Sequence, residues 1–314
     1  MDFRELRYFT YVAELKSFSQ AATQLRIAQS AISRCIGQLE GELGVALFNR
    51  HGRGVTLTEA GQTLYERAQV LLSGLQQARE DVATTSRVPR GHLRLAVPPA
   101  VGQVLTPPLI ERYRALYPQV TLHIHEGFSG YMYEWLLSGR VDVAVMHNPV
   151  PHPSLDIQHL LTEHMNVIVP GPRSEGRKHW TPLESYGVAD LAKLPLILPS
   201  RPHSLRVLME QAVGERGDTL NIALEADGLP TIKSLVMRGL GVTVFTYVAI
   251  TMEAANGTLA AIPLEPGIDW RLEVASRRDR NKSVAARELI RLIDEEVHAL
   301  VKAGIWQGSP QLDS

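Results

Sequence analysis

The segment from Leu15 to Leu39 contains no acidic residue, although Asp and Glu supply 33 of the 314 residues of the chain. Glu14 precedes this segment and Glu40 follows it. A surface without carboxylates does not repel an anion such as the phosphate backbone of a nucleic acid. The segment therefore predicts a surface that binds an anion.

Two short helical patterns lie within this segment. Ser19 is the expected N-cap of the first helix, and Ile32, Ile36, Leu39 and Leu43 form a buried stripe on the second, at spacings of four, three and four. Two helices joined by a tight turn form a helix-turn-helix, whose second helix lies in the major groove of DNA. An ordinary pair of packed helices is the alternative. The residues expected to contact DNA from the two helices are Ser19, Gln20, Gln29, Ser30, Ser33, Arg34 and Gln38.

The segment after the second helix, LFNRHGRGVTLT, predicts a β-hairpin with a basic tip. Its cationic residues are Arg50, His51 and Arg53, and they alternate with Gly52 and Gly54, which permit a tight turn. A basic hairpin beside a recognition helix contacts the phosphate backbone or enters the minor groove, as a wing does. The alternative is a solvated hairpin without a DNA contact.

A long helix is expected from Glu59 to about Ser86. Its apolar residues recur at the heptad spacing of a helix that packs lengthwise on a partner helix. These residues are Leu64, Ala68, Leu71, Leu75, Ala78 and Val82. A dimer held by this stripe would present two helix-turn-helix domains to the two halves of an interrupted palindrome. If the stripe instead packs on its own chain, the expected state is a monomer.

Beyond Pro89 and Gly91, β-rich runs alternate with helical stretches, which predicts parallel sheets covered by helices. Strands are expected at 93–97, 120–126, 141–146, 165–171, 195–200, 220–227 and 242–246, and helices at 102–116, 129–138, 204–216, 229–238 and 283–303. The runs 259–264 and 270–278 return the chain to the first group of strands. Two lobes with a cleft between them follow from this order.

The chain resembles a known family along nearly its full length. Residues Leu6–Gly61, which include LRYFTYVAELKSFSQAATQLRIAQSAISRCIGQLEGELGVALF and GRGVTLTEAG, are similar to the winged helix-turn-helix of LysR-type transcriptional regulators, and residues 91–305 resemble that family's effector-binding domain. The segments LAVPPAVGQ, LILPSRPHSLR and EADGLPTIKSLVMRGLGVTVF are most similar to the branch of nitrogen assimilation control proteins.

The resemblance implies an α/β chain with an N-terminal all-α winged helix-turn-helix, a long linker helix and a two-lobed effector domain like a periplasmic binding protein. The DNA-binding domain is expected at 1–58 and the dimerisation helix with its hinge at 59–90. The effector domain would span 91–305, with lobe I at about 91–162 and 267–305 and lobe II at about 163–266. A flexible tail is expected at 306–314.

Ligands of such lobes collect where strands end and helices begin. The positions that the resemblance places around the cleft are Pro99, Ala100, Ser129, Ser200, Arg201, His203, Thr231, Phe245 and Thr246. A small anion is expected there, for instance a carboxylate paired with Arg201. Helix capping is the alternative role for Ser129, Ser204 and Thr231. The further partners implied are promoter DNA, RNA polymerase and a second copy of the chain, as a homodimer that assembles to a homotetramer.

Composition excludes several classes of site. Cys35 is the only cysteine and the chain has a net charge of −1, so no disulfide forms within the chain and overall charge indicates no partner. No signal peptide pattern and no apolar run of membrane-spanning length is present, which predicts a cytoplasmic protein that makes no contact with a membrane. His123 and His125 share a strand face, but no further ligand completes a metal site.

No catalytic residue, cofactor or metal is expected, because the chain has no nucleophile elbow, phosphate-binding loop or zinc-protease motif. The sequence thus predicts a transcriptional regulator that is not an enzyme. The alternative is a cytosolic solute-binding or sensor protein whose N-terminal module binds protein instead of DNA.

Overall fold

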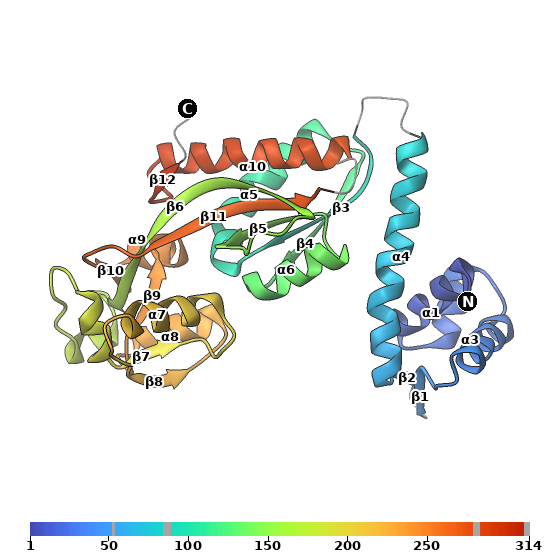
Figure 1. Ribbon diagram of the computed structural model, residues 1–314, viewed down its shortest axis with the longest axis horizontal. Helices are drawn as coiled ribbons and strands as arrows, with labels where there is room; N and C mark the ends of the chain where they lie inside the picture. Colours follow the sequence, from blue (N-terminus) through green and yellow to red (C-terminus); the bar gives the residue numbers. More distant parts are fainter. Residues whose placement is uncertain (52–53, 84–88, 279–282, 311–314) are drawn as a thin grey trace. The chain divides into compact units, whose positions relative to one another are not determined.

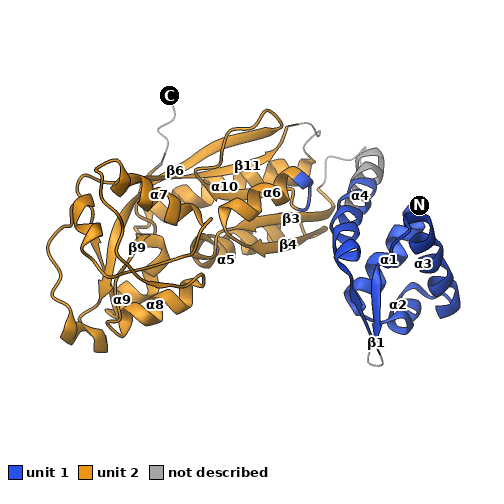
Figure 2. Ribbon diagram, turned by 60° about the horizontal axis from the view of Figure 1, so that its bottom comes forward, with its two compact units in different colours: residues 1–87, 138–140 blue, residues 88–137, 141–314 orange. Residues whose placement is uncertain are grey.

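The computed structural model describes residues 1–51, 54–83, 89–278 and 283–310. The chain forms two compact units, shown in Figure 2. The first consists of Met1–Arg87 with Ser138–Arg140, and the second of Val88–Leu137 with Val141–Ser314.

The first unit is a three-helix head with a hairpin and a long helix (Figure 1). Its elements are α1 (Phe3–Leu15), α2 (Phe18–Leu25), α3 (Gln29–Leu43), the strands β1 (Phe48–His51) and β2 (Gly54–Leu57), and α4 (Glu59–Ala83). One face of each helix meets in a core that includes Phe9, Ile32, Ile36 and Leu39, all completely buried. The helix-turn-helix and the hairpin are confirmed.

Two local expectations in the head are wrong. The N-cap of α2 is Ser17, whose Oγ accepts a hydrogen bond from the Gln20 N–H at 3.3 Å, so Ser19 lies inside the helix. Leu43 is 39% exposed, because it lies in the last turn of α3, directly before Gly44 ends the helix at a φ of 71°. The buried stripe of α3 therefore stops at Leu39.

The start of α4 packs tightly against the segment that connects α3 to β1. The Thr58 side chain caps α4 by accepting from the Gly61 N–H at 3.0 Å, and it donates to the Ala46 carbonyl at 2.7 Å. A Cβ at Gly61 would overlap the Leu47 carbonyl oxygen. Only glycine lets the helix approach the hairpin this closely.

Lobe I of the second unit is a sheet with helices on both faces. Its strands are β3 (Gly91–Val97), β4 (Val120–Glu126), β5 (Val143–His147), the first half of β6 (Leu155–Pro170) and β11 (Asp269–Arg277). Leu95 and Val145 face a core with α5 (Pro99–Leu116) and α10 (Val284–Lys302). The alternate residues Ala96 and Ala144 pack with α6 (Ser129–Ser138) on the other face.

Lobe II has its own core around the second half of β6. The strands β9 (Thr243–Thr246) and β10 (Leu259–Pro263) pair with β6, and β7 (Leu196–Leu198) pairs with β8 (Ile222–Glu225). The helices of this lobe are α7 (Ser204–Gly214), α8 (Leu229–Met237) and α9 (Thr251–Asn256), with 3-10 turns η1 (Glu175–His179), η2 (Val188–Ala192) and η3 (Tyr247–Ile250).

The two-lobed fold is confirmed, but its sheets are not purely parallel. β3 pairs in parallel with β4 and β5, whereas β6 pairs antiparallel with β9, β10 and β11. β6 is 16 residues long and belongs to both lobes, as Figure 1 shows. No helix separates β5 from β6, so the alternation of strands and helices did not indicate the first half of β6.

The expected flexible tail is wrong for residues 306–310. Trp306 is 1% exposed in the core of lobe I, and β12 (Ser309–Pro310) pairs with Thr162 and Leu161 of β6. Residues 311–314 lie outside the described residues. Among the helices that the structure describes, none has the length and apolar character to cross a membrane.

Candidate DNA-reading surface and effector cleft

The polar face of α3 lies opposite its buried stripe. Gln29, Ser30, Arg34 and Gln38 are exposed on this face, and Ser33 is half-buried. Ser19 and Gln20 are exposed on α2, and the Ser19 hydroxyl donates to Gln29 Oε1 at 3.3 Å. This contact joins the two helices at the surface predicted to read DNA.

Two cations beside this surface were not among the predicted contacts. Lys16 and Arg26 are exposed and end α1 and α2 in the left-handed conformation, with φ values of 51° and 56°. The Lys16 carbonyl accepts from the Val55 N–H at 3.1 Å, which ties the hairpin to the end of α1. Their positive charge and their position in the acid-free segment could have identified them as DNA contacts from the sequence.

The hairpin docks on the head through Arg50. The Arg50 guanidinium lies 5.2 Å from the centroid of the Phe18 ring and 3.9 Å from Glu40 Oε2. Glu40 also accepts from the Leu47 N–H at 2.8 Å, so it organises the base of the hairpin. Arg50 and His51 remain exposed, whereas Arg53 lies outside the described residues.

The heptad stripe on α4 does not form one free surface. Ala68 is completely buried in the core of the head, and Leu64 packs against the same core. This corrects the expectation that Ala68 faces a partner helix, because its side chain is already covered by its own chain. Leu71 is 47% exposed and Leu75 is half-buried. The side chains of Ala78 and Val82 lie outside the described set.

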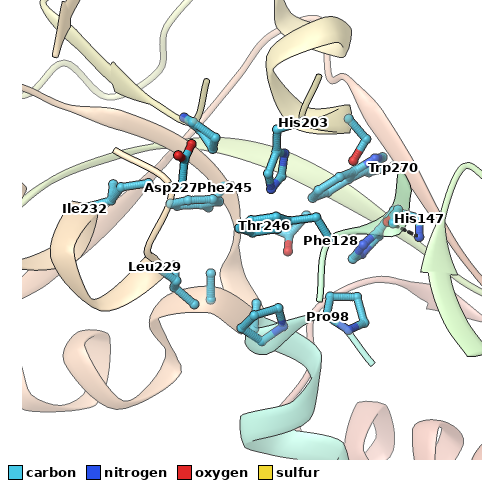
Figure 3. Close-up of a pocket in the computed structure, with 16 residues that line it drawn as sticks. Pro98, Phe128, His147, His203, Asp227, Leu229, Ile232, Phe245, Thr246 and Trp270 are labelled. Atoms are coloured by element: carbon cyan, nitrogen blue, oxygen red, sulfur yellow. Dashed lines mark hydrogen bonds between the residues drawn. The ribbon is translucent and has the colours of Figure 1, made fainter. Parts of the chain in front are cut away.

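The second unit holds two adjoining cavities between its lobes. We call the first, drawn in Figure 3, the inner pocket; its volume is about 50 Å³. It is lined by Pro98, Pro99, Ala100, Phe128, Ser129, His147, Pro199, His203, Ser204, Asp227, Leu229, Ile232, Phe245, Thr246, Ala249 and Trp270. We call the second the outer cavity; its volume is about 350 Å³. It is lined by Phe128, Gly130, Tyr131, Glu134, Ser200, Arg201, Pro202, His203 and Asp227.

Three residues line both cavities and so lie between them: Phe128, His203 and Asp227. Phe128 precedes α6 in lobe I, and His203 precedes α7 in lobe II. Their rings meet edge to face with centroids 4.3 Å apart. This aromatic contact joins the two lobes at the boundary of the two cavities.

Six of the nine predicted effector residues line the inner pocket. These are Pro99, Ala100, Ser129, His203, Phe245 and Thr246. Ser200 and Arg201 line only the outer cavity, and Thr231 lines neither cavity. Ser129 does not cap α6; its Oγ accepts from the backbone N–H of His147 at 3.2 Å.

Arg201 lines the outer cavity and not the inner pocket. Its side chain is 71% exposed and its guanidinium pairs with Glu210 Oε2 at 2.6 Å. It therefore lies outside the inner pocket and already has a carboxylate partner from its own chain. Neither Lys nor Arg is present among the residues that line the inner pocket.

The prediction also missed Phe128, His147, Asp227 and Trp270. His147 stacks on Trp270 with ring centroids 3.8 Å apart, and its Nε2 lies 2.9 Å from Oε2 of the buried Glu163. These residues belong to strand ends and loops that are distant in sequence, so the spacing of residues gave no signal for them.

Neither His203 nor Asp227 supplies a positive charge to the inner pocket. Burial lowers the pKa of His203 to about 4, so the ring is neutral near pH 7. Its Nδ1 accepts from the Leu205 N–H at 3.1 Å, which leaves the ring proton on Nε2. Asp227 accepts from the Ser200 N–H at 2.9 Å and from its hydroxyl at 2.7 Å, and these bonds lower the pKa of Asp227.

Known proteins match both units. Residues 3–62 match the family "Bacterial regulatory helix-turn-helix protein, lysR family", and residues 86–297 match the family "LysR substrate binding domain". The HTH-type transcriptional regulator BbuR of Bordetella bronchiseptica is 33% identical over 306 residues, which cover 97% of this chain and 93% of that protein. The nitrogen assimilation regulatory protein nac of Escherichia coli is 31% identical over 265 residues, which cover 83% of this chain and 84% of that protein.

Solved structures share the fold. A full-length OxyR variant from Pseudomonas aeruginosa has a TM-score of 0.69 and 25% identity, and the match covers 100% of this chain and 99% of that chain. Full-length CbnR in complex with its target DNA has a TM-score of 0.64 and 22% identity, with 95% and 99% covered. The family matches and relatives favour DNA binding over a protein-binding module and regulation over catalysis. The chain belongs to the LysR family and is a DNA-binding transcriptional regulator with an effector-binding domain.

Proposed function

We propose that this regulator binds an interrupted palindrome in promoter DNA as a dimer of dimers, with α3 in the major groove of each half-site. The observation that carries this proposal is the separation of faces on α3. Ile32, Ile36 and Leu39 are completely buried, while Arg34 and Gln38 are exposed on the opposite side. Polar side chains on a free helix face are what base edges in the major groove require.

Contacts to the phosphate backbone would come from the ends of the helices and from the wing. Lys16, Arg26, Arg50 and His51 are exposed there, with no acidic residue between Leu15 and Leu39. Phosphate contacts fix position and base contacts fix sequence. These cations would set the strength of binding, and α3 would set its specificity.

The effector would occupy the inner pocket and bias the relative position of the lobes. Both lobes line this pocket, so a ligand that fills it favours the arrangement that contacts it best. The shift in DNA binding is limited by the difference in ligand affinity between the arrangements. RNA polymerase is the partner through which the bound regulator would alter transcription, in the cytoplasm.

The test is a gel shift with the promoter region next to the regulator's own gene. Arg34→Ala should weaken specific binding by about tenfold or more, as expected for loss of one base contact worth ~1–3 kcal/mol. Arg7→Ala is the matched control, because Arg7 is an exposed arginine on α1, outside the acid-free segment. A salt series should show that wild-type binding weakens as salt rises.

Two outcomes would contradict the proposal. If Arg34→Ala and Arg7→Ala bind the promoter equally well, α3 does not read the DNA. If the wild-type protein gives no shift of the promoter fragment at low salt, the head does not bind this DNA.

A further inference from the structure

The inner pocket is rich in aromatic rings and poor in positive charge. Phe128, Phe245 and Trp270 line it together with two histidines, and Asp227 is its only Asp or Glu (Figure 3). Aromatic faces attract a cation through the ring quadrupole, and aromatic cages are a known solution for ammonium ligands. A carboxylate beside such rings adds a charge partner.

The two histidines of the inner pocket are compatible with a cationic ligand. His203 is neutral near pH 7 because burial lowers its pKa to about 4. His147 is hydrogen-bonded to Glu163, whose side chain is fully buried. The Glu163 carboxyl group lies 2.9 Å from His147 Nε2, so it would pair with any positive charge on that ring within the chain. The inner pocket thus presents no net positive side chain to a ligand.

Carboxylates also line the outer cavity. Glu134 and Asp227 line it, and its one cation, Arg201, already pairs with Glu210. An anion that entered this cavity would meet two carboxylates and would share Arg201 with Glu210. A cation would meet the carboxylates directly.

Three of the helix ends around the cleft have lost part of their set of N–H donors. α5 begins with Pro99 and α8 has Pro230 in its first turn, and a proline has no N–H group. At the start of α7, the Leu205 N–H is already bonded to His203. These three helix ends therefore offer fewer N–H groups to an anion than the start of α6 at Ser129, which has no proline in its first turn.

We propose that the effector is a small organic cation, an alkylammonium group that enters the inner pocket between Phe128, Phe245 and Trp270 with Asp227 as its charge partner. This inference rests on the proposed role of the cleft as the effector site. The inner pocket has a volume of about 50 Å³, about a third of the engineered cavity of about 150 Å³ that binds benzene. It therefore admits one alkyl substituent of the ammonium group, while the charged nitrogen lies at the boundary with the outer cavity, which Asp227 also lines. The remainder of the ligand lies in the outer cavity of about 350 Å³.

Three compounds with one carbon skeleton test the charge directly. Choline carries a trimethylammonium group, 3,3-dimethylbutan-1-ol replaces its nitrogen with carbon, and 3,3-dimethylbutanoate carries a negative charge. Thermal unfolding and calorimetric titration of the full-length protein measure their binding. Choline should raise Tm and bind about tenfold more tightly than the alcohol, and the carboxylate should bind more weakly than both.

Asp227→Asn and Arg201→Gln separate the two charge preferences. Asp227→Asn retains an oxygen that accepts both bonds from Ser200, so it removes the charge with little change in the loop. It should reduce choline affinity to the level of the alcohol, whereas Asp218→Asn, which changes an exposed acidic residue that lines neither cavity, should leave choline affinity unchanged. Tighter binding of the carboxylate than of choline, with its loss in Arg201→Gln, would show that the effector is an anion.

Ethanolamine and tetramethylammonium extend the test to other alkylammonium groups. If none of the three cations raises Tm, the inference is wrong. Equal affinity for choline and the alcohol would also overturn it. The gel shift with wild-type protein is independent of these results, so failure of this inference is distinguishable from failure of the proposed DNA binding.

Discussion

Glu163 is completely buried, and both of its carboxylate oxygens have hydrogen-bond partners. Oε2 lies 2.9 Å from His147 Nε2 in the inner pocket, and Oε1 accepts from Trp306 Nε1 at 2.9 Å. A buried carboxylate without such partners would cost several kcal/mol. This one residue on β6 therefore links the pocket wall to the chain segment that follows α10.

Trp306→Phe removes one of these two partners. The free energy of unfolding of the second unit should fall by about 1–3 kcal/mol from the unpaired carboxylate oxygen, besides the cost of the smaller ring. Trp270→Phe is the matched control, because Trp270 is also buried and its Nε1 has no hydrogen-bond partner among the described residues. Urea denaturation measures both. Equal losses in the two variants would show that the hydrogen bond to Glu163 does not stabilise the fold.

His203 makes stability depend on pH. Burial lowers its pKa from 6.5 to about 4, so the unfolded chain binds a proton more readily than the folded one. The stability that this histidine contributes is full above pH 6.5 and is lost as pH falls towards 4, by an amount on the order of 3 kcal/mol.

His203→Asn should flatten the slope of stability against pH between 4 and 6.5, because asparagine does not titrate and still caps α7. Urea denaturation at several pH values checks this. An unchanged slope would mean that another group accounts for the loss.

At the scale of elements, hydrogen bonds to backbone groups hold the hairpin and the start of α4 in place. Thr58 caps α4 and bonds to the Ala46 carbonyl, and the Lys16 carbonyl accepts from Val55 in the hairpin. The Glu40 side chain on α3 accepts from the Leu47 N–H, directly before β1. The wing is therefore fixed relative to α3, which is the condition for two DNA-contacting elements to act together.

Gly61→Ala tests this close packing. The added Cβ would overlap the Leu47 carbonyl, so the free energy of unfolding of the head should fall by about 2 kcal/mol or more. Gly41→Ala in α3 is the control, since no atom lies within 4 Å of its Cβ, and it should stabilise the helix by about 0.5–1 kcal/mol. Thermal denaturation compares the two, and a neutral Gly61→Ala would show that the junction is not tight.

At the scale of the whole molecule, the apolar residues of α4 serve two purposes. Ala68 and Leu64 complete the core of their own head, whereas Leu71 is exposed. An exposed leucine within a heptad stripe is what a partner helix would cover. The proposed dimer would therefore use the part of α4 beyond Ala68.

Leu71→Glu should shift the protein towards monomers in sedimentation and reduce promoter affinity by at least tenfold, because two linked heads bind more tightly than one. Its Tm as a monomer should change little, since Leu71 is 47% exposed. Leu116→Glu changes an equally exposed leucine on α5 and is the control. Dimers that persist in Leu71→Glu would assign the interface to another surface.

The sequence by itself determined the elements and the family. The spacing of apolar residues located α3 and α4, and β-rich runs located the strands of both lobes except the first half of β6 and β12. The absence of acidic residues from Leu15 to Leu39 marked the helix-turn-helix. These features are local. A helix or strand buries one side, so its apolar residues recur in the sequence with the period of that helix or strand. The glycines flanking Arg53 likewise indicated the hairpin from sequence alone.

Only the tertiary structure decided which side chains meet in the cleft. Phe128, His147, Asp227 and Trp270 come from four separate elements, and Arg201 lies outside the pocket although it follows the same strand as His203. Whether Ala68 or Leu71 faces a partner also depends on how α4 packs against the head. Such positions depend on long-range packing and on competing ion pairs such as Arg201–Glu210, and neither has a period that can be read along the chain.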